Sequence, residues 1–314
     1  MTAVPRIVVS GEALMDLFPG SDTPGGMALD ARVGGSPFNV AIGLARLSRP
    51  VTFFGAVSKD LLGERLLKAL RDDGVGVDAI TRLDAPTTLS LVGLDARGVP
   101  SYAFYGEGAA DRMLPVSALE RLQPAEAFHF GSYSMVMEPV TGTLRALATR
   151  EHPRSVIAYD PNVRLQVEPS LERWRAALAW MLPHTHLLKI SDEDLDLLFP
   201  DADASALATE WLRAGVALVV VTRGAQGASA WTAAHHVDVR PAPVTVVDTV
   251  GAGDSFQAAL LAALAERGLL TSERLRSLRL TALCDVLGFA TRAAGMTCSR
   301  QGADLPRREE LEGA

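Results

Sequence analysis

A glycine-rich segment, Asp248–Phe256, contains the residues with the clearest chemical potential. Gly251 and Gly253 let the backbone approach a ligand closely, and with Ala252 they place free amide N–H groups where an anion can bind. Asp254 stands in the first turn of an expected helix and is suited to accept a proton from an attacking hydroxyl. The helix should begin near Gly253 and bury a stripe of apolar residues: Phe256, Leu260 and Leu264. A base beside an anion hole predicts phosphoryl transfer.

A second glycine-rich segment, Gly34–Ala41, leads into another expected helix, whose apolar stripe is Val40, Leu44 and Leu47. Gly34 and Gly35 permit close approach to a ligand, and Asn39 offers a donor and an acceptor suited to sugar hydroxyls. Each segment alone also fits a structural interpretation, in which a glycine-rich turn precedes a capped helix and Asp254 only compensates the helix dipole.

Composition excludes several classes of protein. The 314 residues are 48% hydrophobic and 21% charged, as in an ordinary globular chain. The net charge of −7 is spread without a basic run, so nucleic acid and anionic lipid are not expected partners. The two cysteines, Cys284 and Cys298, exclude a disulfide framework and a four-cysteine zinc site. We find neither a signal peptide nor an apolar run of ~20 residues, and we expect a cytoplasmic protein.

The elements that position these motifs are short apolar runs separated by helical patterns, at Ile7–Ser10, Val51–Val57, Phe128–Gly131, Val156–Asp160, Leu187–Ile190 and Leu218–Thr222. This alternation predicts a parallel sheet covered on both faces, with the active site beyond the carboxyl ends of its strands. Two stretches break the rhythm, at about residues 12–32 and 86–108. In the second, Thr87–Leu94 and Ser101–Tyr105 flank Asp95–Gly98 and predict a β-hairpin. We expect one domain over 1–314 with these stretches as a small β lid.

Taken together, the two glycine-rich motifs resemble the signatures of the PfkB (ribokinase-like) carbohydrate kinase family, most of all its bacterial fructokinases. Further matching segments span nearly the whole chain: Gly11–Leu17, Pro86–Thr88, Glu107–Arg112, Asp160–Arg164, Thr222–Gly224 and Cys298–Ala303. The resemblance implies a Rossmann-type α/β/α sandwich with a mostly parallel central sheet and a small β-sheet lid. It also implies ATP and Mg²⁺ as cofactors and a homodimer built through the lids. A P-loop is absent, so the phosphates must lie at the Gly251 region.

The resemblance assigns roles residue by residue. Asp254 becomes the catalytic base, and the backbone of Gly251, Ala252 and Gly253 forms the anion hole. The acceptor sugar is assigned to Asp16, Gly34, Gly35, Asn39 and Arg164, the last suited by its planar fork of donors. The nucleotide is assigned to Lys189, Thr222, Gly224, Gly251, Gly253, Ala290, Ala294 and Cys298. On the hairpin, Tyr102, Phe104 and Tyr105 either cover the sugar or pack against a second lid in a dimer.

The same resemblance also implies sites for two metal ions. The family's Asn-x-x-Glu element appears here as Ser191–Asp194, which leaves the magnesium-linked carboxylate open between Glu193 and Asp194, acting through water. A potassium site is implied beside the anion hole, at Asp248, Val250, Ala294 and Gly302. We assign no metal role to His235 and His236, and we interpret the remaining histidines (His129, His152, His184 and His186) as scattered and structural and Cys284 as core.

The expected reaction transfers the γ-phosphoryl group of ATP to a primary hydroxyl of a free sugar, with fructose giving fructose 6-phosphate. Alternatives are a kinase for 2-keto-3-deoxygluconate, ribose or adenosine, because pocket contacts choose the acceptor. Arg164 and Arg112 could serve an acidic acceptor. A catalytically silent sugar or nucleotide sensor is a further alternative, against which the intact Asp254 argues.

Overall fold

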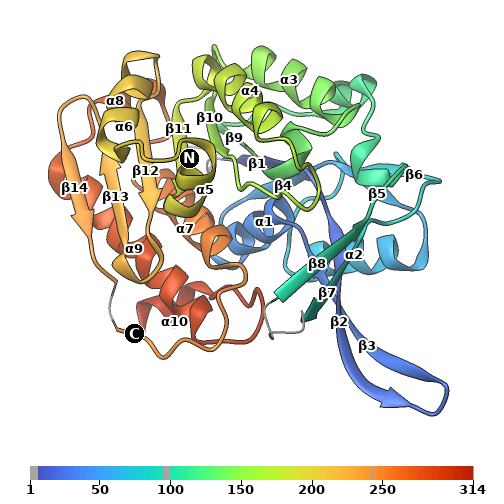
Figure 1. The fold of residues 1–314 in the computed structure, drawn as a ribbon. Helices are drawn as coiled ribbons and strands as arrows, with labels where there is room; N and C mark the ends of the chain where they lie inside the picture. Colours follow the sequence, from blue (N-terminus) through green and yellow to red (C-terminus); the bar gives the residue numbers. More distant parts are fainter. Residues whose placement is uncertain (1–5, 95–99, 242, 314) are drawn as a thin grey trace.

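The centre of the molecule is an eight-stranded sheet, seen in a computed structural model that describes residues 6–94, 100–241 and 243–313 (Figure 1). In spatial order the strands are β14 (His236–Val239), β13 (Ala228–Trp231), β12 (Leu218–Thr222), β11 (Leu187–Ser191), β10 (Val156–Asp160), β9 (Ala127–Gly131), β1 (Ile7–Ser10) and β4 (Val51–Phe54). The six strands from β12 to β4 are parallel, whereas β13 and β14 join antiparallel at one edge. The predicted mostly parallel sheet is confirmed.

Helices cover both faces of this sheet, because its buried strands are apolar on both sides. One face packs against α1 (Ser36–Arg46), α2 (Leu61–Asp72), α7 (Ala252–Glu266), α9 (Leu280–Cys298) and α10 (Arg308–Glu312). The other face packs against α3 (Val140–Glu151), α4 (Leu171–Met181), α5 (Asp192–Leu198) and α6 (Ala204–Arg213). A further short helix, α8 (Ser272–Arg276), places Leu275 in the first core. The three layers form the expected α/β/α sandwich.

Helix α7 is the central helix of its layer. It packs against α9 and α1, and nearly every side chain after its first turn is buried. The predicted stripe, Phe256, Leu260 and Leu264, is confirmed as buried, although the apolar surface extends around the whole helix. The helix therefore holds its N-terminal residues rigidly against the carboxyl ends of the strands.

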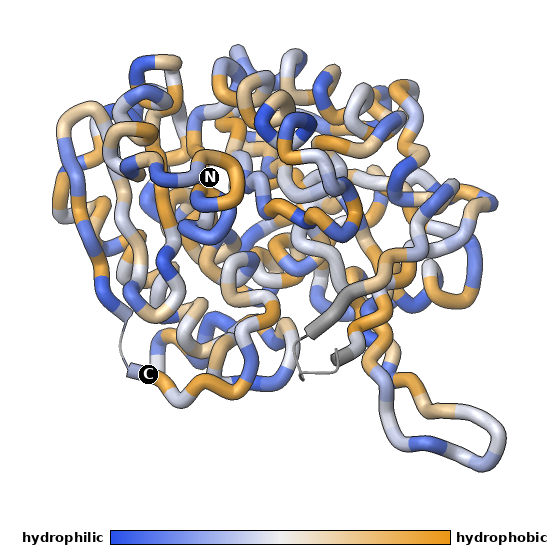
Figure 2. The backbone as a smooth tube through the Cα atoms, in the orientation of Figure 1, coloured by the Kyte–Doolittle hydropathy of each residue, from blue (hydrophilic) through white to orange (hydrophobic). Residues whose placement is uncertain are grey.

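A second sheet of four strands, in the order β3-β2-β7-β8, stands beside the sandwich. Its strands are β2 (Leu14–Thr23), β3 (Gly26–Gly34), β7 (Leu89–Leu94) and β8 (Pro100–Tyr105). The expected hairpin is confirmed by the antiparallel pairing of β7 and β8, while its tip at 95–98 lies outside the described residues. The β2–β3 hairpin projects from the body, and Figure 2 shows hydrophobic and hydrophilic segments along it. Closure of this sheet over a ligand remains a prediction.

The structure corrects several details of the sequence interpretation. The run Val51–Val57 divides into β4 and β5 (Ala56–Ser58), because the chain leaves the main sheet at Gly55 and pairs with β6 (Thr81–Leu83). Cys284 is exposed on the outer side of α9 and is not a core residue. Among the described residues, no helix is both long enough and apolar enough to cross a membrane.

Candidate active site

Asp254 lies at the N-terminus of α7, where its carboxylate is buried and bonded on both oxygens. The hydroxyl of Ser36 donates to Oδ1 over 2.6 Å, and the amide of Asn39 donates to Oδ2 over 2.8 Å. Gly251 caps the helix in the left-handed conformation, with a φ of 77°. A Cβ atom at Gly251 would lie 2.6 Å from that of Ala303, so glycine fits here for two reasons. The glycine-rich turn thus sets the base beside the backbone of the expected anion hole, where the N–H of Ala252 donates to the carbonyl of Thr249 over 3.2 Å.

Helix α1 supplies both partners of Asp254. Gly35 caps α1 with a φ of 108°, and a Cβ there would stand 2.9 Å from the backbone oxygen of Glu12. Pro37 occupies the first turn, where its missing N–H is not needed. Ser36 and Asn39 are three positions apart and therefore face the same way. The sequence interpretation missed Ser36, although this i, i+3 spacing was a signal for it.

The environment of Asp254 acts in two directions on its pKa. Burial raises the pKa above its ordinary value, while the bonds from Ser36 and Asn39 and the charges of Lys189 and Arg164 oppose this rise. The carboxylate is thus held in a fixed orientation by donors and cations together. This is the arrangement that a general base requires.

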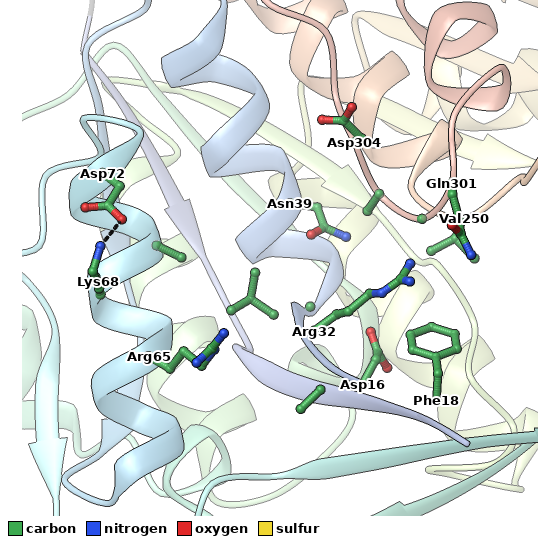
Figure 3. A pocket seen from close by; sticks show the side chains of 16 residues that line it. Asp16, Phe18, Arg32, Asn39, Arg65, Lys68, Asp72, Val250, Gln301 and Asp304 are labelled. Carbon is green, nitrogen blue, oxygen red and sulfur yellow. Dashed lines mark hydrogen bonds and ion pairs between the residues drawn. The ribbon is translucent and has the colours of Figure 1, made fainter. Parts of the chain in front are cut away.

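A cavity of about 700 Å³ opens in front of Asn39, between the second sheet and the helices α1 and α2 (Figure 3). Asp16, Gly34 and Asn39, all expected to contact sugar, line it together. Burial raises the pKa of Asp16, and the neighbouring Asp254 carboxylate adds to the rise while Arg164 opposes it. Sequence reasoning missed further lining residues: Phe18, Arg32, Arg65, Lys68 and Gln301.

The other expected acceptor residues are placed differently. Phe104 packs edge-on against Tyr133, with 6.5 Å between ring centroids, and is not among the residues that line the described cavity. Tyr105 is exposed, and the side chain of Tyr102 lies outside the described residues. Arg164 is exposed, and its charge opposes the rise in pKa of Asp16, Asp194 and Asp254, so it stands near all three.

The other expected nucleotide residues lie on β11 and β12, in the turn after β12 and on α9. Lys189 is buried and pairs with Asp160 over 2.6 Å. A Cβ at Gly253 would lie 3.1 Å from the ammonium of Lys189, so this cation adjoins the anion hole. Thr222 ends β12, and Gly224 begins the following 3₁₀ turn. The remaining expected residues lie along α9: Ala290, Ala294 and Cys298.

The two carboxylates expected at the magnesium ion differ in burial. Asp194 is buried, whereas Glu193 is exposed on the same short helix. Burial and the nearby Asp160 carboxylate raise the pKa of Asp194 to about 6. Oδ1 of Asp160 is buried and has no hydrogen-bond partner among the described residues. Within that same part of the chain, no group of three or more His, Cys, Asp or Glu side chains is arranged to hold a metal ion.

Asp248 joins the segments that were assigned to potassium. Its Oδ1 accepts the N–H of Val250 over 3.0 Å, and its Oδ2 accepts the N–H of Gly302 over 2.8 Å. The carbonyl of Cys298 accepts the N–H groups of Val247 and Asp248. The loop before α7 is therefore tied to the C-terminal segment and to the end of α9.

The positions of two further sets of residues are relevant here. Arg112 lies 5.5 Å above the Tyr133 ring and is not among the residues that line the described cavity, so a role toward an acidic acceptor stays a prediction. His152, His184 and His186 are not scattered, because His152 stacks on His186 at 4.6 Å and meets His184 edge-on at 5.9 Å. Each ring bonds to a backbone group, which agrees with a structural role.

These features define a class: an α/β kinase in which a buried aspartate at a helix N-terminus is bonded to Asn39, a residue that lines the acceptor cavity. Residues 4–310 match the family model described as "pfkB family carbohydrate kinase", and the chain belongs to this family. It is 41% identical over 273 residues to a fructokinase of Rhizobium leguminosarum bv. trifolii, covering 87% of this chain and 83% of that one.

Solved structures agree with this assignment. A fructokinase with bound ATP from Xylella fastidiosa is 28% identical, with a TM-score of 0.89 over 99% of this chain and 98% of that chain. A double mutant of the fructokinase from Vibrio cholerae O395, in a form with fructose, ADP and potassium ion bound, is 26% identical. Its TM-score is 0.84, over 99% of this chain and 98% of that chain.

Proposed function

We propose that this protein is an ATP-dependent fructokinase that transfers the γ-phosphoryl group to a primary hydroxyl of fructose, giving fructose 6-phosphate. The observation that carries the proposal is the Asp254 carboxylate, which is held by Ser36 and by Asn39, a residue that itself lines the acceptor cavity. The related fructokinases support the choice of acceptor.

In the proposed reaction, Asp254 accepts the proton of the attacking hydroxyl, since it is the buried carboxylate beside the glycine turn. The backbone of Gly251, Ala252 and Gly253 receives the negative charge that develops on the transferring group. Lys189 adjoins the same turn and adds positive charge there. Asp16, Gly34, Gly35 and Arg164 are proposed to orient the sugar, and the second sheet is proposed to close and exclude water.

The carboxylates suit a magnesium ion. Oδ1 of Asp160 has no hydrogen-bond partner among the described residues, and burial together with the Asp160 carboxylate raises the pKa of Asp194, so a cation beside these two acids would stabilise their charged forms. We therefore propose Asp194 rather than Glu193 as the magnesium-linked acid. We add Asp160, which the sequence did not indicate, as a second carboxylate near the ion. Bound magnesium would neutralise charge on the phosphates of ATP.

Potassium is proposed beside Asp248, Val250, Ala294 and Gly302. The fit rests on the donor chemistry, because carboxylate and carbonyl oxygens are hard ligands, and Asp248 gathers this loop by its bonds to two backbone amides. The segment adjoins the turn that carries Gly251, so a cation there would stabilise its shape.

Nucleotide contacts are proposed for Thr222, Gly224, Ala290, Ala294 and Cys298, which lie on β12, the turn after it and α9. A homodimer through the second sheets is also proposed, because β3 exposes Met27 and Leu29 and β8 exposes Tyr105. We propose the cytosol as the site of action, where ATP and free sugar are both available. The whole chain is proposed to act as one kinase domain.

The acceptor choice is open to a direct test: ADP release with Mg-ATP against fructose, glucose, mannose, ribose, 2-keto-3-deoxygluconate and adenosine, with Asp254→Asn as the control. We expect fructose to give the highest kcat/KM and the variant to lose about 10²–10⁴-fold, the typical contribution of a general base. If another acceptor gives the highest kcat/KM, the protein is a kinase of that acceptor within the same family. If the wild type releases no ADP with any acceptor, the sensor alternative is favoured.

A further inference from the structure

Three of the four points at which the chain enters or leaves the second sheet are linked, directly or through Asp111, to one turn of the sandwich, Ser132–Met135. Glu12 lies two residues before β2, Thr88 directly before β7, and Asp111 in the 3₁₀ turn that follows β8. The backbone also links two of these roots, because the N–H of Met15 donates to the carbonyl of Thr88 over 3.0 Å. Three separate connections between the sandwich and the second sheet are thus held at one place, which we call the support.

The contacts at this support are hydroxyl–carboxylate bonds. Ser134 donates through its Oγ to Oε2 of Glu12. Asp111 accepts the hydroxyl of Tyr133 over 2.8 Å on one oxygen and the hydroxyl of Thr88 over 2.5 Å on the other. Glu12 is 1% exposed, Asp111 3% and Tyr133 2%, so water does not compete for these bonds. We call these five residues the root cluster.

The root cluster also touches the helix that orients the base. A Cβ at Gly11 would lie 2.5 Å from Pro37 of α1 and 3.0 Å from Oγ of Ser134. The backbone oxygen of Glu12 packs against Gly35, the cap of α1. Through α1, the support of the second sheet is therefore continuous with the partners of Asp254.

Tyr133 is the centre of this arrangement. Its ring receives Phe104 of β8 edge-on at 6.5 Å and the guanidinium of Arg112 at 5.5 Å, while its hydroxyl reaches Asp111. The turn that carries it begins at Ser132 in the left-handed region, with a φ of 57°. A strained backbone and a directional bond fix where the second sheet meets the sandwich.

We propose that Glu12, Asp111 and Tyr133 are positioning residues that fix the pivot of the lid relative to Asp254 and so set acceptor binding and turnover. Burying two carboxyl groups in one cluster costs free energy that an apolar core would not, which argues for a role in orientation. Burial raises the pKa of Glu12 to about 7, and the charge of Asp111 adds to the rise, so the two carboxyl groups interact electrostatically.

The kinetic part of the test rests on the proposed function and uses Tyr133→Phe, which removes one hydroxyl and keeps the ring. We expect KM for fructose to rise about 5- to 10-fold and kcat to fall, with KM for Mg-ATP changed less than 2-fold, because the nucleotide side does not contact the root cluster. Tyr159→Phe is the matched control, since that buried hydroxyl has no hydrogen-bond partner among the described residues. It should leave all three constants unchanged.

The structural part of the test needs no substrate. Hydrogen exchange should be faster in β2, β7 and β8 of Tyr133→Phe and unchanged in β1 and β9. Glu12→Gln should retain the wild-type pattern better than Glu12→Ala, because the amide keeps an oxygen for Ser134.

Unchanged exchange in the second sheet, or a loss of unfolding free energy without any change in KM for fructose, would overturn the inference. If fructose is not the acceptor, the exchange experiment still decides it, and the kinetic comparison is repeated with the acceptor found. Thr88→Val provides a second variant if Tyr133→Phe fails to fold.

Discussion

The side-chain amide of Asn39 donates to Oδ2 of Asp254 over 2.8 Å, although 215 residues separate them in the chain. This bond joins the N-terminal turns of α1 and α7, which pack against one another over the central sheet. Asn39 therefore acts on the base itself, in addition to lining the acceptor cavity. The two glycine-rich motifs form one site.

Asn39→Ala should make the base harder to ionise. The bond stabilises the charged carboxylate, so its loss raises the pKa of Asp254, which burial already raises. We expect the acidic limb of the kcat/KM profile to move to higher pH, and Ser36→Ala to move it in the same direction. Gln301→Ala is the control, since it lines the same cavity with no bond to Asp254 among the described residues. A profile that keeps its acidic limb in Asn39→Ala contradicts this role.

Much of this site could be predicted from local pattern, and the rest depends on tertiary neighbours. Gly251 and Asp254 were identified because a glycine turn before an apolar helical pattern has a local physical meaning. Asp160 was not, because its importance comes from Lys189 on the next strand and from burial that no local pattern encodes. The contact of Arg112 with Tyr133 could not be predicted for the same reason, since charge alone does not reveal it.

The buried pair of Lys189 and Asp160 should be costly to break. Lys189→Met leaves the Asp160 carboxylate uncompensated near Asp194, and we expect the free energy of unfolding in urea to fall by about 3–5 kcal/mol. The exposed pair of Lys68 and Asp72 is the control, and Lys68→Met should cost less than about 1 kcal/mol.

A double variant separates stability from function. Lys189→Met with Asp160→Leu removes both charges and should recover most of the lost stability, but not the activity, because Lys189 adjoins the anion hole. Equal losses of stability in Lys189→Met and Lys68→Met would refute the assignment of a buried pair.

Glu12 should make stability fall as the pH rises. Its pKa is about 7 in the folded state against an ordinary 4.5, so between these values the folded protein binds more protons than the unfolded chain. The stability that this group contributes is therefore fully present below about pH 4.5 and is lost as the pH rises through about 7. Glu12→Gln should flatten this slope and gain at most about 3 kcal/mol at pH 8. Urea unfolding midpoints measured across this pH range give the pH dependence of stability. The control is Glu193→Gln at an exposed position, which should leave that dependence unchanged.

The ion pairs of the acceptor cavity bear on the choice between neutral and acidic sugars. Arg32 reaches into the cavity from β3, with its guanidinium 5.0 Å above the Phe18 ring (Figure 3). Its Nε and Nη2 atoms both lie 2.7 Å from Oδ2 of Asp30, so its charge is already compensated. A carboxylated acceptor would meet this neutral pair, the acidic Asp16, the pair of Lys68 with Asp72, and Arg65.

Asp30→Asn should therefore free Arg32 and shift selectivity toward acidic sugars. The pair is partly exposed, so its contribution is about 1 kcal/mol, and we expect the ratio of kcat/KM for 2-keto-3-deoxygluconate to that for fructose to rise about 5-fold. Adding Arg32→Gln should cancel the gain, because the released cation is then absent. Asp22→Asn removes a carboxylate from the neighbouring strand β2 and should not change the ratio. A ratio that stays constant in Asp30→Asn would mean that Arg32 does not interact with the charge of the acceptor.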